Sequence, residues 1–222
     1  MKILSLNVWF DNYLKEERTS LLIDYILTKD FDVIMLQEVT ASVLSFIYKR
    51  ISNVYPNIHT DVYEGSYGTC IISKFEIKDR QNFKFNNSRM NRGLVFGKIN
   101  DIIFCTSHFE SEFSTHFMTK VDQFNQTFNY LSKFKKVFFI GDTNITKKNK
   151  KHLNHNNFID VYLNIDNSKD NIYTYDGIKN PFLNNKIRSR VDRCYLKDIP
   201  PKNYLLEKDI IMSDHYALLI EI

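Results

Sequence analysis

The chain has 222 residues, 43% of them hydrophobic, which is enough for one domain with a sizeable buried core and short for two. No apolar run approaches the roughly 20 residues of a membrane-spanning helix, and residues 1–7 turn polar too early for a secretory signal. The formal net charge of +4 favours an anionic partner. We therefore expect one domain over residues 1–222 that is intracellular, in the nucleus or the cytoplasm, and neither secreted nor bound to a membrane.

Buried strands and amphipathic helices alternate in the first part of the chain. The hydrophobic pattern predicts a strand at 2–9 and a helix at about 17–29. A short buried strand at 32–36 and a second helix at about 40–52 follow. This alternation is typical of an α/β domain.

A run of strands without intervening helices comes next, which predicts antiparallel hairpins. The expected strands are at about 57–63, 68–74, 76–85, 92–99 and 102–108. Beyond them the pattern predicts a long helix at about 115–133 and strands at 137–140, near 190–196 and at 215–222. So many strands favour a mixed α/β domain with two packed sheets and helices outside them.

Five polar clusters stand where a buried strand ends or begins. They are Asn7, Gln37–Glu38, Ser107–Ser111, Gly141–Asn144 and Ser213–His215. The ends of strands are where α/β sheets place active sites, because side chains from several strands meet there. One such cluster alone is more often a turn or a solvated surface, whereas all five in one chain predict a functional site.

The residue types in these clusters suit hydrolysis of a phosphodiester, which needs charge neutralisation, an oriented water and help for the leaving oxygen. Glu38 is the best candidate metal ligand, since carboxylate oxygens suit Mg²⁺ and no Lys or Arg lies nearby in the sequence to neutralise it. Asp142 can orient and deprotonate a water molecule. His215 can donate to a phosphate oxygen, with Asp214 placed to fix or polarise that site.

The ordered set of clusters resembles the endonuclease/exonuclease/phosphatase superfamily, which has the DNase I-like fold. Within it, finer strings resemble the tyrosyl-DNA phosphodiesterase 2 family. These strings are Leu36–Val39, Thr106–Ser111, Gly141–Asn144, Tyr173–Asp176, Arg190–Arg193 and Ser213–Leu219. The resemblance implies a four-layer α/β sandwich. It also implies cleavage of the phosphotyrosyl bond between a DNA 5′ end and a trapped topoisomerase II tyrosine, leaving a 5′-phosphate.

Carried over motif by motif, the resemblance implies a role for each residue of the site. Glu38 and Asp142 would be metal ligands, and Asn7 would help Asp142 to prepare the attacking water. The phosphate would be held by Asn144, His108, Ser111 and His215. An asparagine suits these roles, because its amide donates and accepts without repelling a phosphate. The implied cofactor is Mg²⁺, for which Mn²⁺ can substitute.

Four further residues would bind the substrate. Arg92 matches an arginine that lines the DNA groove in this family, and Tyr67 matches an aromatic residue that packs on the DNA end. Tyr175 takes the place of a tryptophan in the same hydrophobic wall, and Arg190 begins one of the matching strings. The implied partner is a DNA 5′ end that carries a tyrosyl adduct, or an RNA end of the same kind. No obligate protein partner follows.

The chain departs from the family pattern at three motifs. Leu6-Asn7-Val8 stands where Thr-Trp-Asn is usual, Thr146 where an arginine is common, and Val191 where an aromatic residue is usual. The first two changes leave the expected metal chemistry intact and leave the substrate preference open. The basic run 147–151, just after the cluster at 141–144, is either a track for a phosphate backbone or a solvated loop.

Two other functions compete with this one. The first is another nuclease of the superfamily, such as an abasic-site endonuclease or a nonspecific DNase or RNase. The second is a non-catalytic protein that binds nucleic-acid ends. Such a protein would usually lack a metal or water ligand, and here the candidates are all present: Glu38, Asp142, Asn144, Asp214 and His215. The sequence therefore favours an enzyme.

Overall fold

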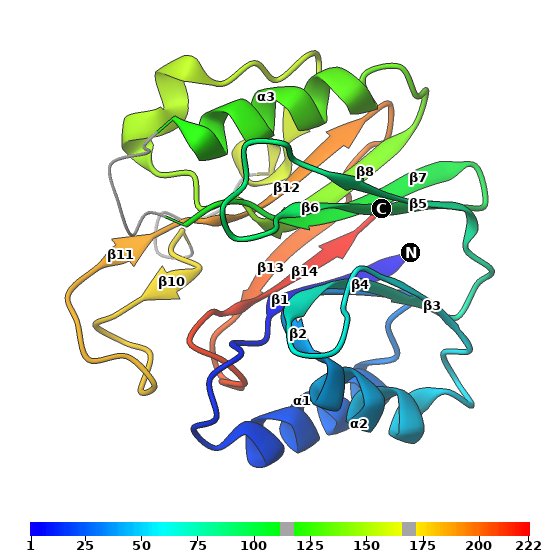
Figure 1. Cartoon of the computed structure of the whole chain (residues 1–222), viewed down its shortest axis with the longest axis vertical. Helices are drawn as coiled ribbons and strands as arrows, with labels where there is room; N and C mark the ends of the chain where they lie inside the picture. The colour runs from blue at the N-terminus through cyan, green and yellow to red at the C-terminus, as the bar shows by residue number, and fades with distance from the viewer. Residues whose placement is uncertain (112–117, 166–171) are drawn as a thin grey trace.

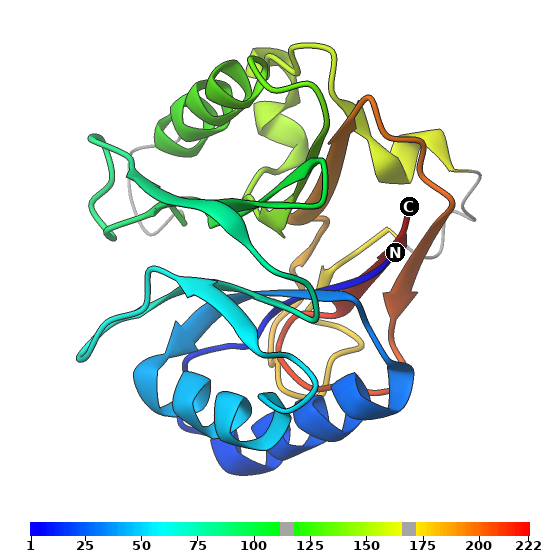
Figure 2. The same cartoon turned by 90° about the vertical axis from the view of Figure 1, so that its right-hand side faces the viewer.

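The computed structural model describes residues 1–111, 118–165 and 172–222. Within these residues, two six-stranded sheets pack face to face, with helices on their outer faces (Figure 1). A view turned by 90° shows the four layers, with blue helices below the two sheets and a green helix above them (Figure 2). This arrangement confirms the expected four-layer α/β sandwich.

The first sheet has the strand order β13-β14-β1-β2-β4-β3. Its strands are β1 (Lys2–Asn7), β2 (Val33–Thr40), β3 (Asn57–Thr60), β4 (Tyr67–Ser73), β13 (Asn203–Glu207) and β14 (Ala217–Glu221). Strands β1 and β2 are parallel, and the other neighbours are antiparallel. Two helices, α1 (Lys15–Lys29) and α2 (Ala41–Ile51), cover the outer face of this sheet.

The second sheet has the strand order β5-β6-β7-β8-β12-β9, and only its β7 and β8 are parallel neighbours. Its strands are β5 (Lys78–Lys84), β6 (Gly93–Ile99), β7 (Ile102–His108), β8 (Val137–Asp142), β9 (Ile159–Asp160) and β12 (Asp192–Lys197). Helix α3 (Thr119–Leu131) covers it. The remaining elements are the 3₁₀ helix η1 (Lys147–His152), the short helix α4 (Val161–Asn164) and the ribbon of β10 (Tyr175–Asp176) and β11 (Arg188–Ser189).

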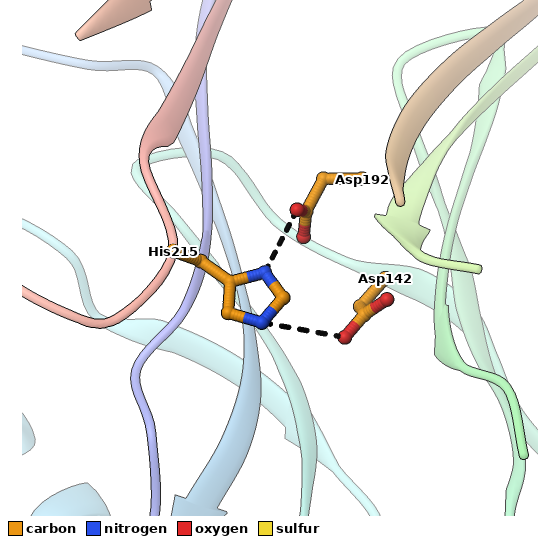
Figure 3. A group of neighbouring side chains, drawn as sticks. All are labelled: Asp142, Asp192 and His215. Carbon is orange, nitrogen blue, oxygen red and sulfur yellow. Dashed lines mark hydrogen bonds and ion pairs between the residues drawn. The ribbon is translucent and has the colours of Figure 1, made fainter. Parts of the chain in front are cut away.

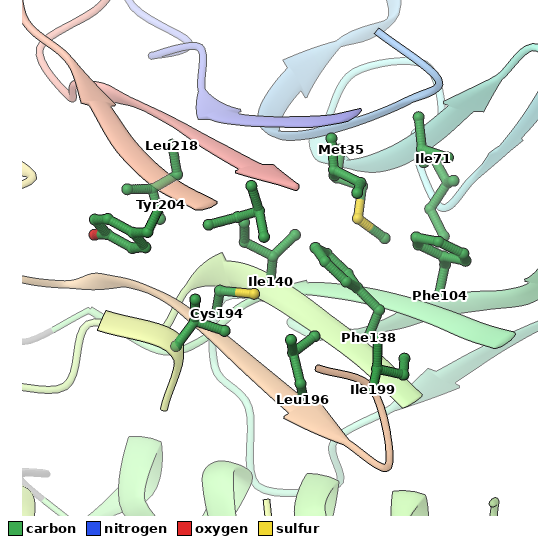
Figure 4. Packing of buried hydrophobic residues seen from close by; sticks show 14 of the residues in the cluster. Met35, Ile71, Phe104, Phe138, Ile140, Cys194, Leu196, Ile199, Tyr204 and Leu218 are labelled. Carbon is green, nitrogen blue, oxygen red and sulfur yellow. The ribbon is translucent and has the colours of Figure 1, made fainter. Parts of the chain in front are cut away.

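The central strands are apolar on both faces, because one face meets the other sheet and the opposite face meets helices. In β2, Met35 lies in the core between the sheets, whereas its neighbour Leu36 packs in the core beneath α1 and α2. Phe104 of β7 and Phe138 of β8 enter the intersheet core from the second sheet (Figure 4). The uninterrupted apolar runs of the sequence are therefore strands buried on both sides.

The helices were expected close to where they lie. Helix α3 buries Val121, Phe124, Phe128 and Leu131, which recur at helical spacing. The expected start of this helix includes residues 115–117, which lie outside the described residues. Among the helices of the described chain, none has both the length and the apolar character needed to cross a membrane.

The expected strands were wrong at one connection, and four strands were not expected: β13 and the two-residue strands β9, β10 and β11. Hairpins do form at β3–β4, β5–β6 and β6–β7, but the consecutive strands β4 and β5 belong to different sheets. The chain crosses between the sheets there, and Ile77 in the connection is buried in the core between them. Strand β13 was not expected, although Tyr204 and Leu206 alternate inward along it with the two-residue period of a strand.

The aromatic packing under α3 predicts a large loss of stability for Phe128→Ala. The Phe128 ring centroid lies 4.3 Å from that of Phe124 and 5.1 Å from that of Phe139, so truncation leaves a cavity. We expect a loss of about 3–5 kcal/mol in the free energy of unfolding, measured by urea denaturation. The control Leu163→Ala removes a side chain that is 64% exposed and should cost less than about 0.5 kcal/mol. Equal losses in the two variants would contradict the packing described here.

Candidate active site

The polar side chains expected at strand ends do meet at one end of the two sheets. Asn7 is the last residue of β1, His108 the last of β7 and Asp142 the last of β8. Asp192 opens β12 and pairs directly with Asp142 across the antiparallel β8–β12 ladder. His215 lies just before β14, the strand beside β1. Both sheets therefore contribute to one site.

The Asn7 side chain joins carboxylates from the two sheets. Its Nδ2 donates to Glu38 Oε1 at 3.0 Å and lies 3.1 Å from Asp142 Oδ2. The Asn7 Oδ1 in turn accepts from the backbone N–H of Trp9 at 3.0 Å, which fixes the orientation of the amide. Asn7 thus holds Glu38 and Asp142 in one group. Their roles toward a metal ion or a water molecule stay a prediction.

Glu38 reaches this group from within β2, and not from its end as the sequence suggested. The ladder between β2 and β4 shifts register between Leu36 and Val39, so Glu38 sits in a bulge of the strand. Its φ of 58° lies in the left-handed region, which is unfavourable for a residue with a side chain. The bulge directs the carboxylate to Asn7 and to the backbone N–H of Phe10, which donates to Glu38 Oε2 at 3.1 Å.

His108 is held as a neutral ring. Arg92 Nη1 donates to His108 Nδ1 at 2.9 Å, and since a guanidinium only donates, the ring proton must be on Nε2. Burial lowers the pKa of His108 well below its usual value, with further lowering by the charges of Arg92 and His215. The Nε2–H lies 3.4 Å from Asp142 Oδ2 and 3.8 Å from Glu38 Oε1. His108 can therefore donate to an oxygen at the site without carrying a charge.

His215 has the opposite character. Its Nδ1 lies 2.8 Å from Asp192 Oδ2 and its Nε2 3.9 Å from Asp142 Oδ2 (Figure 3). Burial alone would lower the pKa of His215, but the carboxylates of Asp192, Asp214 and Asp142 raise it well above the usual value. His215 is thus a charged donor at neutral pH, whose ring orientation is set by Asp192.

Asp192 is the functional residue that the sequence did not reveal. It stands between Arg190 and Arg193 in the sequence, a pattern that suggests a salt-bridged acid. In the structure both arginines contact Asp160 instead, and Asp192 is left to hold His215. The only hint in the sequence was the matching string Arg190–Arg193.

Asp142 lies at the centre of the group. Burial raises the pKa of Asp142 to about 7, and the neighbouring Asp192 raises it too, against the lowering effects of His215 and of hydrogen bonds from Asn144 and Asn7. The backbone N–H of Asn144 donates to Asp142 Oδ1 at 2.9 Å, and the Asn144 side chain donates to the Phe109 carbonyl at 3.0 Å. A carboxylate with such a pKa is suited to accept a proton near neutral pH.

The acidic groups fit a divalent cation, because a positive ion would offset the burial and the repulsion from Asp192 that raise the pKa of Asp142. One set is the carboxylates of Glu38 and Asp142, whose oxygen atoms are of the kind that Mg²⁺ prefers and which the Asn7 Nδ2 bridges. The other is Asp142, Asp192 and His215, which could hold a metal ion, since one ligand atom from each lies within 4.8 Å of the others. The nitrogen donor and the raised pKa of His215 make the second set less suited to Mg²⁺.

Three of the other expected site residues lie beside this group. Asp214 accepts from Ser213 Oγ at 3.0 Å, and burial raises its pKa. The Tyr175 ring meets the His215 ring edge to face at 5.4 Å. Tyr67 accepts at its hydroxyl from Arg92 Nη2 at 3.3 Å. Aromatic side chains therefore flank the catalytic group on two sides.

Three of the expected residues make different contacts. Gln37 turns away from the site, and its Nε2 joins the sheets by donating to Thr106 Oγ1 at 3.0 Å. The Ser111 Oγ lies 3.3 Å from Met90 Sδ. Arg190 is buried and donates to both carboxylate oxygens of Asp160 at 2.7 and 2.5 Å, so its contacts are those of an internal ion pair. Substrate binding by Arg190 and Ser111 stays a prediction.

The family of the chain is established by comparison with known proteins. The model of the endonuclease/exonuclease/phosphatase family matches residues 4–215, and the chain belongs to this family of phosphoesterases. It is similar to human tyrosyl-DNA phosphodiesterase 2, with 25% identity over 228 residues that cover 91% of this chain and 62% of the human protein. The chain thus spans less than two thirds of the length of the curated relatives that it matches.

Solved structures show the same fold. The truncated TDP2 of Caenorhabditis elegans matches with a TM-score of 0.85 and 22% identity, over 99% of this chain and 95% of that one. The TDP2 of D. rerio, complexed with a single-strand DNA product, matches with a TM-score of 0.85 and 22% identity, over 99% of this chain and 97% of that one. These matches confirm the DNase I-like architecture.

The two possible metal positions predict different effects of substitution. We expect Glu38→Gln to weaken Mn²⁺ binding by more than about 100-fold, beyond the range usual for residues that only orient a ligand. Asp192→Asn should stay within the range of about 10–100-fold that such outer residues show. The measurement is calorimetric titration, with the exposed Asp101→Asn as a control that should leave the affinity unchanged. The reverse order would place the ion with Asp192 and His215.

Proposed function

We propose that this phosphoesterase is a divalent-metal-dependent phosphodiesterase that hydrolyses 5′-phosphotyrosyl adducts on DNA or RNA ends and leaves a 5′-phosphate. The observation that carries the proposal is the closed group of Asn7, Glu38, His108, Asp142 and His215, in which a base and two kinds of proton donor face one another. The distant similarity to tyrosyl-DNA phosphodiesterase 2 supports the choice of substrate.

Each group has a task that follows from its surroundings. Asp142, the buried carboxylate at the centre of the group, takes a proton from the attacking water, and the Asn7 amide orients that water beside it. His108, neutral and fixed by Arg92, donates from Nε2 to a phosphate oxygen. His215, charged and held by Asp192, donates to another as negative charge develops. A bound Mg²⁺ would supply the remaining positive charge for the phosphate.

A basic cavity lined by Arg190 and Arg193, which flank Asp192 in the chain, supports a polynucleotide as the remainder of the substrate. The cavity, of about 330 Å³, is lined by six cationic side chains: Lys147, Lys148, Lys150, Arg188, Arg190 and Arg193. Asp160 and Asp176 neutralise part of this charge. Burial and the charges of Arg193 and Arg190 lower the pKa of Lys150, a sign of crowded positive charge. A chain of phosphates would relieve that crowding.

The cavity also offers an aromatic face. Tyr173 lines it, and the guanidinium of Arg188 lies 4.3 Å from the centroid of the Tyr173 ring. Cations that track a backbone and aromatic rings that stack on bases are the usual means of binding single-stranded nucleic acid. Strands β10 and β11, which carry Tyr175 and Arg188, extend beyond the ends of the two sheets (Figure 1). We infer that the nucleic acid leaves the site on this side.

A panel of oligonucleotides tests the proposal. We expect rapid release of tyrosine from 5′-phosphotyrosyl DNA or RNA with Mg²⁺ or Mn²⁺, little cleavage of 3′-phosphotyrosyl or abasic substrates, and no turnover in EDTA. Asp142→Asn should lower kcat by about 10²–10⁴-fold with little change in binding of the oligonucleotide, because its role is in proton transfer. Equal rates on abasic and phosphotyrosyl DNA would overturn the choice of substrate and favour another nuclease activity of the family.

The basic cavity predicts a change in salt dependence. The double variant Lys147→Gln/Lys148→Gln should lower the slope of log(kcat/KM) against log[salt] by about 0.7 for each phosphate contact that is lost on a single-stranded substrate. The nitrophenyl ester of thymidine 5′-phosphate should show no such change, because it lacks further phosphates. Lys49→Gln, an exposed lysine on α2, serves as the control. An unchanged slope would mean that the basic run is a solvated loop.

A further inference from the structure

One side of the catalytic group carries an aromatic ring that the proposed mechanism does not use. Phe10 is 46% exposed, and its ring stacks on that of Tyr67 with centroids 4.7 Å apart and planes within 4°. Its backbone N–H donates to Glu38 Oε2, so the residue is anchored to a candidate metal ligand. Large apolar side chains left exposed at the mouth of a site are candidates for ligand contact.

The backbone around Phe10 is held in place. Trp9 has a φ of 59°, in the left-handed region that a large side chain rarely adopts. The buried guanidinium of Arg18 maintains this conformation, since it donates to the carbonyls of Val8, Trp9 and Asp11. As a result the neighbouring rings of Trp9 and Phe10 have different partners, with Trp9 near Phe182 and Phe10 on Tyr67. The exposed position of Phe10 is thus imposed by the fold.

A chain of contacts connects this ring to the catalytic group. Phe10 contacts Tyr67, the Tyr67 hydroxyl accepts from Arg92, and Arg92 donates to His108. His108 lies 3.4 Å from Asp142. The aromatic pair and Arg92 therefore form one wall of the site, whereas Tyr175, His215 and the basic cavity lie on the side of β10 and β11.

The two sides differ in charge, and so do the two halves of a phosphotyrosyl substrate. The nucleic acid half is a polyanion, which favours the six cations of the cavity. The leaving group is an aromatic ring whose oxygen gains negative charge as the ester bond breaks, and it gains from both an exposed aromatic side chain and the guanidinium of Arg92. Charge favours the nucleic acid on the cationic side, and exposed aromatic surface favours the leaving group at the wall of Phe10, Tyr67 and Arg92. This assignment differs from the DNA contacts that the family resemblance implied for Tyr67 and Arg92.

We propose that Phe10 contacts the aromatic leaving group and makes this enzyme select aryl esters over alkyl esters of a nucleoside 5′-phosphate. The inference rests on the proposed function, because it assigns a residue to the leaving-group side of the same site. Phe10 is a specificity residue, since the chemistry is carried by Asn7, His108, Asp142 and His215. Phe10 contacts the ring of the leaving group and makes no contact with the phosphate in this proposal.

The test compares two esters of thymidine 5′-phosphate. One carries a phenyl group and the other a fluoroalkyl group whose alcohol is about as acidic as phenol, so that the chemical leaving ability is matched. We expect the wild-type enzyme to have a higher kcat/KM on the phenyl ester. Phe10→Ala should reduce the aryl-to-alkyl ratio by about 2–10-fold, which is the value of one aromatic contact. Phe10→Tyr should restore the ratio.

Two further variants separate the possible results. Phe10→Leu keeps an apolar side chain on the loop and should lose most of the selectivity, because it lacks a ring. Tyr13→Ala removes another exposed aromatic ring from the same loop and should leave the ratio unchanged. A Phe10→Ala variant that slows both esters equally would overturn the inference, as would a wild-type enzyme without a preference. Failure of the proposed function would show separately, as equal cleavage of abasic and 5′-phosphotyrosyl oligonucleotides.

Discussion

The burial of Asp142 where the two sheets meet is the constraint on which the site depends. A carboxylate removed from water is unstable as an anion unless donors or positive charge surround it. Here those groups come from every side, with Asn7 and His108 on one side and His215 on the other. The same burial that makes the ion costly also raises its pKa toward neutrality and makes it useful as a base.

The two histidines show how the partner of one ring nitrogen decides the protonation state of the whole ring. Both are buried, and burial alone would keep both neutral. A guanidinium behind His108 makes its neutral form the stable one, whereas the carboxylate of Asp192 behind His215 favours the charged form. The site thus holds an uncharged and a charged donor within reach of one base, a combination suited to a substrate whose charge increases as it reacts.

The fold brings these groups together through two pairs of parallel strands. Strands β1 and β2 lie side by side in one sheet and β7 and β8 in the other, and each pair ends at the site. The bulge in β2 adds Glu38 at a point where a regular strand would have directed its side chain elsewhere. Beyond this rigid centre the walls differ in character, aromatic beside Tyr67 and cationic beside β11. That difference gives an asymmetric substrate one favourable orientation.

The sequence by itself determined the layers and which strand ends carry most of the candidate site residues. The local sequence pattern predicts strands that are apolar on both faces. It also predicts the polar residues at their ends, which are Asn7, His108 and Asp142. Only the tertiary structure decided which partner each charge takes. Asp192 lies between two arginines in the sequence, yet it binds His215, while both arginines contact Asp160. The change of sheet after β4 and the stacking of Phe10 on Tyr67 were also beyond the sequence. The physical reason is the same for all of them, since they depend on contacts between residues far apart in the chain, which no local pattern records.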